Sequence, residues 1–137
     1  MTSSQLDTMA RHYFIAALWS TNNIDIDNDI ETSFSDLDYT TTDINTETYT
    51  KGKEDCKEFI DIISNHGLNI DDILNKYDIG YDDLGHTFWL LRNGHGCTFH
   101  DYVKLPTQLA NILNSIANKF YHEFYGYVDM YGQVIFE

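Results

Sequence analysis

The chain has 137 residues, of which 22 are acidic and 8 are basic, and its formal net charge is −14. This excess of negative charge argues against direct binding to nucleic acid, because such affinity comes mainly from Lys and Arg side chains that neutralise phosphates. The hydrophobic fraction of 42%, with 15% aromatic residues, excludes a disordered acidic chain and indicates one folded domain.

No apolar stretch approaches the roughly 18 residues that a membrane span needs, and the N-terminus lacks the pattern of a signal peptide. Cys56 and Cys97 lie far apart and form no C-x-x-C pair, which favours two buried free thiols over a disulfide. We therefore expect a soluble, cytoplasmic protein that does not bind membranes.

The N-terminal part predicts two helices separated by an acidic segment. Apolar residues recur at helical spacing over residues 5–19, with a serine cap before them. Residues 22–50 contain eight acidic residues and no Lys or Arg, and their scattered apolar residues predict an extended excursion held to the body. An apolar stripe predicts the second helix over residues 47–65, ended by His66-Gly67.

The middle of the chain predicts a short helix followed by a hairpin. Asn69 is a suitable cap for a helix over residues 69–76, and residues 80–85 are expected to form a connector. Aromatic and branched residues predict a strand over residues 87–91. The Asn93-Gly94 pair predicts a tight turn, with a return strand over residues 97–99.

The C-terminal part predicts one more helix and a second hairpin. Pro106 suits the first turn of a helix over residues 106–122. Residues 125–130 and 133–136 flank a turn at Tyr131-Gly132. The resulting prediction is an α+β fold, in which three to four helices cover a small antiparallel sheet made of two hairpins.

The stretch from Gly85 to Asp101, GHTFWLLRNGHGCTFHD, is the densest in chemically active side chains. If the chain is an enzyme, Arg92, Asn93 and His95 at a hairpin tip would hold an anionic group, while His86 or Asp101 would move a proton. No nucleophile elbow or phosphate-binding loop accompanies them. A structural salt bridge is the other interpretation of Arg92.

Two patterns imitate metal sites without completing them. Asp25, Asp27 and Asp29 resemble the start of a calcium loop that Asp36 would close, but Ile30 stands where such a loop needs glycine. A zinc-like ion could be held around the predicted hairpin by a set whose spacing matches no structural zinc motif: His86, His95, His100 and Asp101. We expect no metal and no cofactor.

The acidic residues of the excursion suggest mimicry of nucleic acid. On one face of an extended strand, Asp25, Asp27 and Asp29 would lie about 6 to 7 Å apart, a spacing comparable to that of phosphates along a strand. The same alternation is also typical of an edge strand whose charges prevent aggregation. The candidate partner-binding residues are the acids of the excursion: Asp25, Asp27, Asp29, Glu31, Asp36, Asp38, Asp43 and Glu47.

Four segments together resemble a family of small acidic proteins encoded by tailed bacteriophages and mobile elements. They are YFIAALWST (13–21), DCKEF (55–59), the 85–101 stretch, and YVDMYGQVIF (127–136). The family pattern around the third segment is GHDFWLTRNGHGAGFWD. This chain departs from it at Thr87 and His100, which stand where the family has Asp and Trp. The resemblance implies phage origin and does not imply a mechanism.

These observations favour a non-enzymatic phage protein. It would bind and inhibit a basic, nucleic-acid-handling defence protein of the host, of the CRISPR or restriction type, through the acids of the excursion. The alternative is a small enzyme or metal-dependent protein that acts on a phosphorylated or nucleotide-like compound through the 85–101 hairpin. A third reading is a phage housekeeping protein with an interaction role unrelated to defence.

Overall fold

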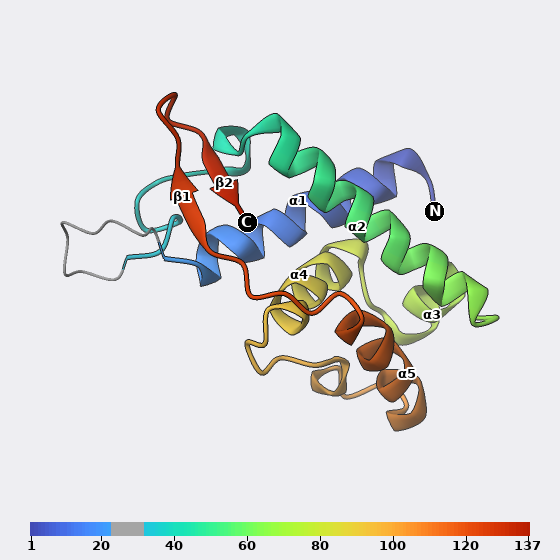
Figure 1. The fold of residues 1–137 in the computed structure, drawn as a ribbon. Coiled ribbons are helices and arrows are strands. Elements are labelled where there is room, and N and C mark those ends of the chain that lie inside the picture. Colours follow the sequence, from blue (N-terminus) through green and yellow to red (C-terminus); the bar gives the residue numbers. More distant parts are fainter. Residues whose placement is uncertain (23–31) are drawn as a thin grey trace.

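The computed structural model describes residues 1–22 and 32–137, which form five α-helices, two short 3-10 helices and one two-stranded sheet (Figure 1). The α-helices are α1 (Ser3–Ser20), α2 (Thr46–Asn65), α3 (Ile70–Tyr77), α4 (Tyr81–Arg92) and α5 (Thr107–Asn118). The 3-10 helices are η1 (Thr41–Asp43) and η2 (Phe99–Asp101). The strands β1 (Gly126–Val128) and β2 (Val134–Phe136) pair antiparallel.

The α+β prediction is wrong, because the helices pack on one another and do not cover a sheet. The error lies in residues 80–99, where the predicted connector and first hairpin are instead α4 and a loop. α4 is buried on nearly all sides, and eight of its twelve residues are buried. A helix without a polar face lacks the helical period, so its aromatic and branched residues resemble a buried strand.

The Asn93-Gly94 pair ends α4 and does not form a hairpin turn. Gly94 has a φ of 72°, in the left-handed region that favours glycine. The His95 amide donates to the Leu90 carbonyl at 3.0 Å, and the Gly94 amide donates to the Leu91 carbonyl at 3.1 Å. This pair of bonds is the Schellman motif, which satisfies the last carbonyl groups of a helix.

The core forms where α4 packs against α1, with side chains of α2 in contact with it (Figure 1). A side chain at Gly85 would place its Cβ 2.1 Å from the Met9 carbonyl oxygen, so glycine is what permits α4 to lie against α1. The rings of Phe59 in α2 and Phe88 in α4 stack with centroids 4.4 Å apart. Burial of apolar surface is the dominant favourable contribution to folding, and each such aromatic side chain removes a large area from water.

The chain after α5 returns along α4 to the β1–β2 hairpin (Figure 1). α5 ends at Asn118, earlier than the predicted residue 122, and residues 119–125 run without regular structure. The predicted second hairpin is confirmed, with Gly126 opposite Phe136 and Val128 opposite Val134.

Residues 32–45 are held against this hairpin. Phe34 and Ile44 are buried, and the Asn45 amide donates to the Val134 carbonyl at 2.9 Å. Leu37, in contrast, is exposed. Within the described residues, no helix combines the length and the apolar character needed to cross a membrane.

Candidate functional site

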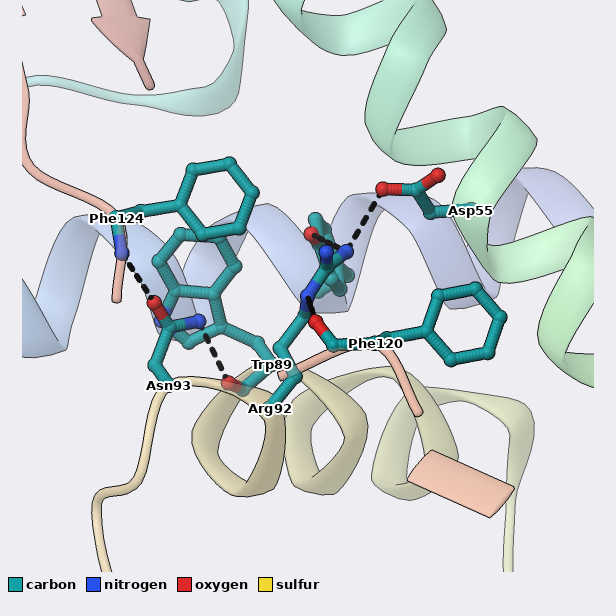
Figure 2. A network of polar contacts seen from close by, with 7 residues as sticks. Asp55, Trp89, Arg92, Asn93, Phe120 and Phe124 are labelled. Atoms are coloured by element: carbon teal, nitrogen blue, oxygen red, sulfur yellow. Dashed lines mark hydrogen bonds and ion pairs between the residues drawn. The ribbon is translucent and has the colours of Figure 1, made fainter. Parts of the chain in front are cut away.

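Arg92, at the C-terminal end of α4, makes more hydrogen bonds than any other buried polar side chain of the described residues. It is only 6% exposed. Its Nη1 donates to Asp55 Oδ2 at 2.7 Å and to the Tyr13 hydroxyl at 3.0 Å, and its Nε donates to the Phe120 carbonyl oxygen at 3.1 Å (Figure 2). The structural salt bridge that the sequence offered as one interpretation of Arg92 is therefore confirmed, with Asp55 as the partner.

Aromatic rings surround the guanidinium group. Its carbon lies 4.9 Å from the ring centroid of Phe124, 5.5 Å from that of Phe88 and 5.7 Å from that of Phe120. A cation over a ring face is attracted by the negative face of the π system, more strongly where water is excluded. Arg92 is thus stabilised as a charged group by one carboxylate, two neutral oxygens and three rings.

Burial also raises the pKa of two ionisable groups next to Arg92 and Asp55. Desolvation raises the pKa of the Tyr13 hydroxyl well above its usual range, and the positive charge of Arg92 only partly opposes this. Desolvation likewise raises the pKa of the Cys56 thiol, which follows Asp55 in α2. Both groups stay protonated at neutral pH, so neither is a nucleophile or a base there.

Asn93 connects α4 to the returning chain. Its Nδ2 donates to the Trp89 carbonyl oxygen at 2.9 Å, and its Oδ1 accepts from the Phe124 amide at 2.8 Å (Figure 2). The His122 amide donates to the Arg92 carbonyl oxygen at 2.9 Å. Together with the Arg92 to Phe120 bond, these contacts fix residues 120–124 to the end of α4.

Between these elements lies a groove of about 690 Å³, which we call the Arg92 groove. Its walls come from α1, α2, α4, the returning segment and β2, and it is lined by Tyr13, Phe14, Asn45, Glu47, Thr48, Lys51, Gly52, Asp55, Trp89, Arg92, Lys119, Phe120, Tyr121, His122, Phe124, Ile135, Phe136 and Glu137. This volume lies within the range of small-molecule sites, roughly 300 to 1,000 Å³.

The five candidate catalytic residues are not brought together in this groove, since only Arg92 lines it. Asn93 is buried and bonded as described. His86 is half-buried, with its ring centroid 6.1 Å from that of the exposed Trp19. His95 is exposed in the Schellman motif, and Asp101 Oδ2 accepts from the Thr98 amide at 3.2 Å.

The zinc and calcium patterns can be compared with the described residues only in part. Within residues 1–22 and 32–137, no three His, Cys, Asp or Glu side chains are grouped so that they could hold a metal ion. Asp25, Asp27, Asp29 and Ile30 lie outside the described residues. Both cysteines are free thiols as predicted, although Cys97 is only half-buried.

The other candidate partner-binding acids are divided in the same way. Glu31 lies outside the described residues, together with the three Asp residues just named. Asp36 and Asp38 are exposed on a turn, and Glu47 is exposed in the first turn of α2. Asp43 is half-buried, and its Oδ2 accepts from the Thr40 amide at 2.8 Å.

Sequence reasoning missed the residues that surround Arg92. Asp55 stands in the DCKEF segment, which the sequence analysis uses only for a resemblance. An aspartate in the middle of an amphipathic helix does not indicate a buried ion pair unless its partner, Arg92, is already known to face it. Tyr13 and Phe124 gave no signal beyond apolar spacing.

Comparisons with protein families, with curated proteins and with solved structures found no match for this chain.

Proposed function

We propose that this protein is a non-enzymatic inhibitor that binds a basic, nucleic-acid-handling defence protein of a bacterial host. Its binding face is the acidic excursion, residues 22–50, whose carboxylates stand in for phosphates. The observation that carries the proposal is the unpaired state of the described acids in this excursion. In residues 1–22 and 32–137, the four ion pairs use Asp7, Asp55, Asp61 and Asp71, and none uses an acid of residues 32–50.

Unpaired, exposed carboxylates suit recognition of a positively charged cleft. They need not be released from an internal partner, and their field accelerates association with an oppositely charged surface. Phe34 and Ile44 hold the described part of the excursion to the body, so these charges are presented from an anchored segment. Phage origin and a defence protein as target rest on the sequence resemblance alone.

The enzymatic alternative has less support. Arg92 and Asn93 are committed to bonds that hold the returning segment, and His86, His95 and Asp101 do not line the groove that contains Arg92. An acid, a base and an anion-binding group must converge within hydrogen-bond reach of one substrate. Residues 85–101 therefore support a structural role better than a catalytic one.

The test is a pull-down from host lysate with mass spectrometry, repeated at rising salt. We expect one dominant basic partner that is lost as salt rises, because screening weakens attraction between exposed charges. Asp36→Asn combined with Asp38→Asn should weaken capture several-fold, and asparagine tolerates the positive φ of 66° at Asp38.

The matched control removes two charges elsewhere. Glu54→Gln with Glu58→Gln changes two exposed acids of α2 outside the excursion and should leave capture nearly unchanged. Equal losses of partner capture in both double variants would show that capture depends on net charge and not on the acids of the excursion. Capture that does not respond to salt would refute the mimicry proposal.

A further inference from the structure

The outer face of the β1–β2 hairpin carries two tyrosines bonded to one carboxylate. The hydroxyl of Tyr125 donates to Glu137 Oε2 at 3.0 Å, and the hydroxyl of Tyr127 donates to Glu137 Oε1 at 2.9 Å. The two rings are stacked, with centroids 6.2 Å apart and an angle of 24° between their planes. One carboxylate thus orients both rings, and we call these three residues the tyrosine–carboxylate face.

The strand pairing explains this arrangement. The backbones of Tyr125 and Glu137 exchange two hydrogen bonds, at 2.9 and 3.0 Å, so their side chains stand opposite each other on the same face of the hairpin. Tyr127 lies two residues further along the strand and therefore points to that face as well. The backbone register places all three side chains together.

The other face of the hairpin is fixed to the core. Val134 is fully buried and Phe136 is 6% exposed, whereas Tyr125 is 49% exposed. The hairpin stands at the edge of the molecule, and its turn projects from the helices (Figure 1). The tyrosine–carboxylate face is therefore open to solvent but held by a packed support, which lowers the entropic cost of binding.

The carboxylate of this face is available to a cation. Residues 120–137 contain three acidic residues and no Lys or Arg. Asp129 serves the turn, because its Oδ1 accepts from the amides of Tyr131 and Gln133. Glu137 forms no ion pair among the described residues, and a carboxylate that accepts two hydroxyls keeps lone pairs for further donors.

Two lysines lie on the other side of Glu137. Lys51 and Lys119 line the Arg92 groove together with Glu137, but neither forms an ion pair with it. Tyr125 and Tyr127 do not line that groove. A cation can therefore reach the carboxylate from the side of the tyrosine rings, outside the groove.

Exposed tyrosine rings beside an unpaired carboxylate match a guanidinium group. The π system of a tyrosine attracts a cation that lies over the ring, and the carboxylate attracts the same cation. Arginine suits both contacts better than lysine, because its planar group stacks on rings and donates several N–H bonds from a rigid fork.

We propose that the tyrosine–carboxylate face binds an arginine side chain of a partner protein. The guanidinium group lies over the two rings and donates to Glu137. Met130 and Tyr131, which are highly exposed at the turn, extend the surface that the partner covers. The proposal does not rest on the inhibitor function, because this face lies outside residues 22–50.

The experiment titrates the ¹⁵N-labelled chain with a capped heptapeptide that contains two arginines among glycines, and follows the amide signals by NMR. We expect saturable shifts at Tyr125, Tyr127 and Glu137, with a Kd of about 1 mM or lower. The same peptide with lysines should bind at least about threefold more weakly. The peptide with citrulline, which is neutral and similar in shape, should cause no saturable shift.

Three variants separate the carboxylate and the rings from general attraction. Glu137→Gln keeps the shape of the side chain and should weaken binding of the arginine peptide at least about fivefold. Tyr125→Leu with Tyr127→Leu keeps the charge and should weaken it to a similar extent. Tyr131→Leu removes an exposed ring that has no carboxylate partner among the described residues, and should change the Kd less than about twofold.

Asp36→Asn with Asp38→Asn should also leave the Kd of the peptide within about twofold, which separates this face from the acidic excursion. Shifts centred on other exposed acids, such as Asp72 in α3 and Asp83 in α4, would overturn the proposal, because they would show attraction to negative charge alone.

Equal binding of the lysine peptide would also overturn the proposal. So would unchanged binding in Glu137→Gln or in the double tyrosine variant. The amide signals of Val134 and Phe136 show whether the hairpin is intact in each variant. If the double tyrosine variant loses these signals, the result for Glu137→Gln decides.

Discussion

At the end of α4, every hydrogen bond of Arg92 and Asn93 is made to the protein, whereas the described acids of residues 32–50 make no ion pair with it. A buried charge is tolerated only when oxygens and rings replace its water, so losing any one partner is costly. An exposed carboxylate keeps its water and contributes little to stability. The first region therefore holds the fold together, whereas the described acids of the second contribute little to its stability.

Removal of the buried charge should have the largest effect. In Arg92→Met, Asp55 loses its ionic partner and residues 120–124 lose one of their bonds to α4. We expect a loss of about 3 to 5 kcal/mol in the free energy of unfolding, measured by urea denaturation. His95→Ala, at an exposed position of the same stretch, should change it by less than about 0.5 kcal/mol. Similar losses in the free energy of unfolding for the two variants would show that the buried ion pair does not hold the fold together.

Alkaline pH should destabilise the protein through the same cluster. Burial raises the pKa values of Tyr13 and Cys56, so the folded chain keeps protons that the unfolded chain loses. Below the ordinary thiol pKa of about 8.5, ionisation of these groups does not lower the free energy of unfolding. Above it, the free energy of unfolding declines by up to about 1.4 kcal/mol per pH unit for each group.

Tyr13→Phe combined with Cys56→Ala should reduce the slope of unfolding free energy against pH between about pH 9 and 11. Part of the slope should remain, because burial also raises the pKa of Tyr81 and Tyr102. The measurement is a urea titration at each pH. An unchanged slope in the double variant would show that these two groups ionise freely in the folded chain.

Asn93→Ala should have a smaller effect than Arg92→Met. It leaves the Trp89 carbonyl and the Phe124 amide without their side-chain partner but buries no unpaired charge. We expect a loss of about 1 to 3 kcal/mol in urea denaturation. A loss as large as that of Arg92→Met would mean that the ion pair is not the dominant contact.

Charge removal in the acidic segment should have the smallest effect on stability. Asp36→Asn with Asp38→Asn is expected to change the free energy of unfolding by less than about 0.5 kcal/mol, because both side chains are exposed. Thermal denaturation at low and high salt measures it. A large change would show that these acids stabilise the fold, which would contradict the difference between the two regions on which the proposed function rests.

The sequence predicted the helices that carry a polar face. α1, α2, α3 and α5 have apolar residues at helical spacing, and Asn69 is the predicted cap of α3, since its side chain accepts from the Asp72 amide. The serine cap predicted for α1 is wrong, because Thr2 caps that helix. α4 could not be found in this way because it is buried on nearly all sides. The Asn-Gly pair fits both a hairpin turn and a helix end, and only the bonds of Gly94 and His95 decide between them.

Of the site, the sequence predicted only the residues that lie in the 85–101 stretch. The density of polar residues in 85–101 singled out Arg92 and Asn93 as candidates, but their partners Asp55, Phe120 and Phe124 are distant in sequence. Long-range pairing of this kind follows from packing and leaves no local spacing to detect. The remaining histidines of the stretch are explained only as exposed or half-buried residues around α4 and the loop that follows it.

Amide hydrogen exchange tests most directly whether Arg92 and Asn93 fix the returning chain. In the unmodified protein, the amides of His122 and Phe124 should exchange as slowly as amides of the core helices, because they donate to Arg92 O and Asn93 Oδ1. In Asn93→Ala, the Phe124 amide should lose most of this protection. Rapid exchange of both amides in the unmodified protein would contradict the account.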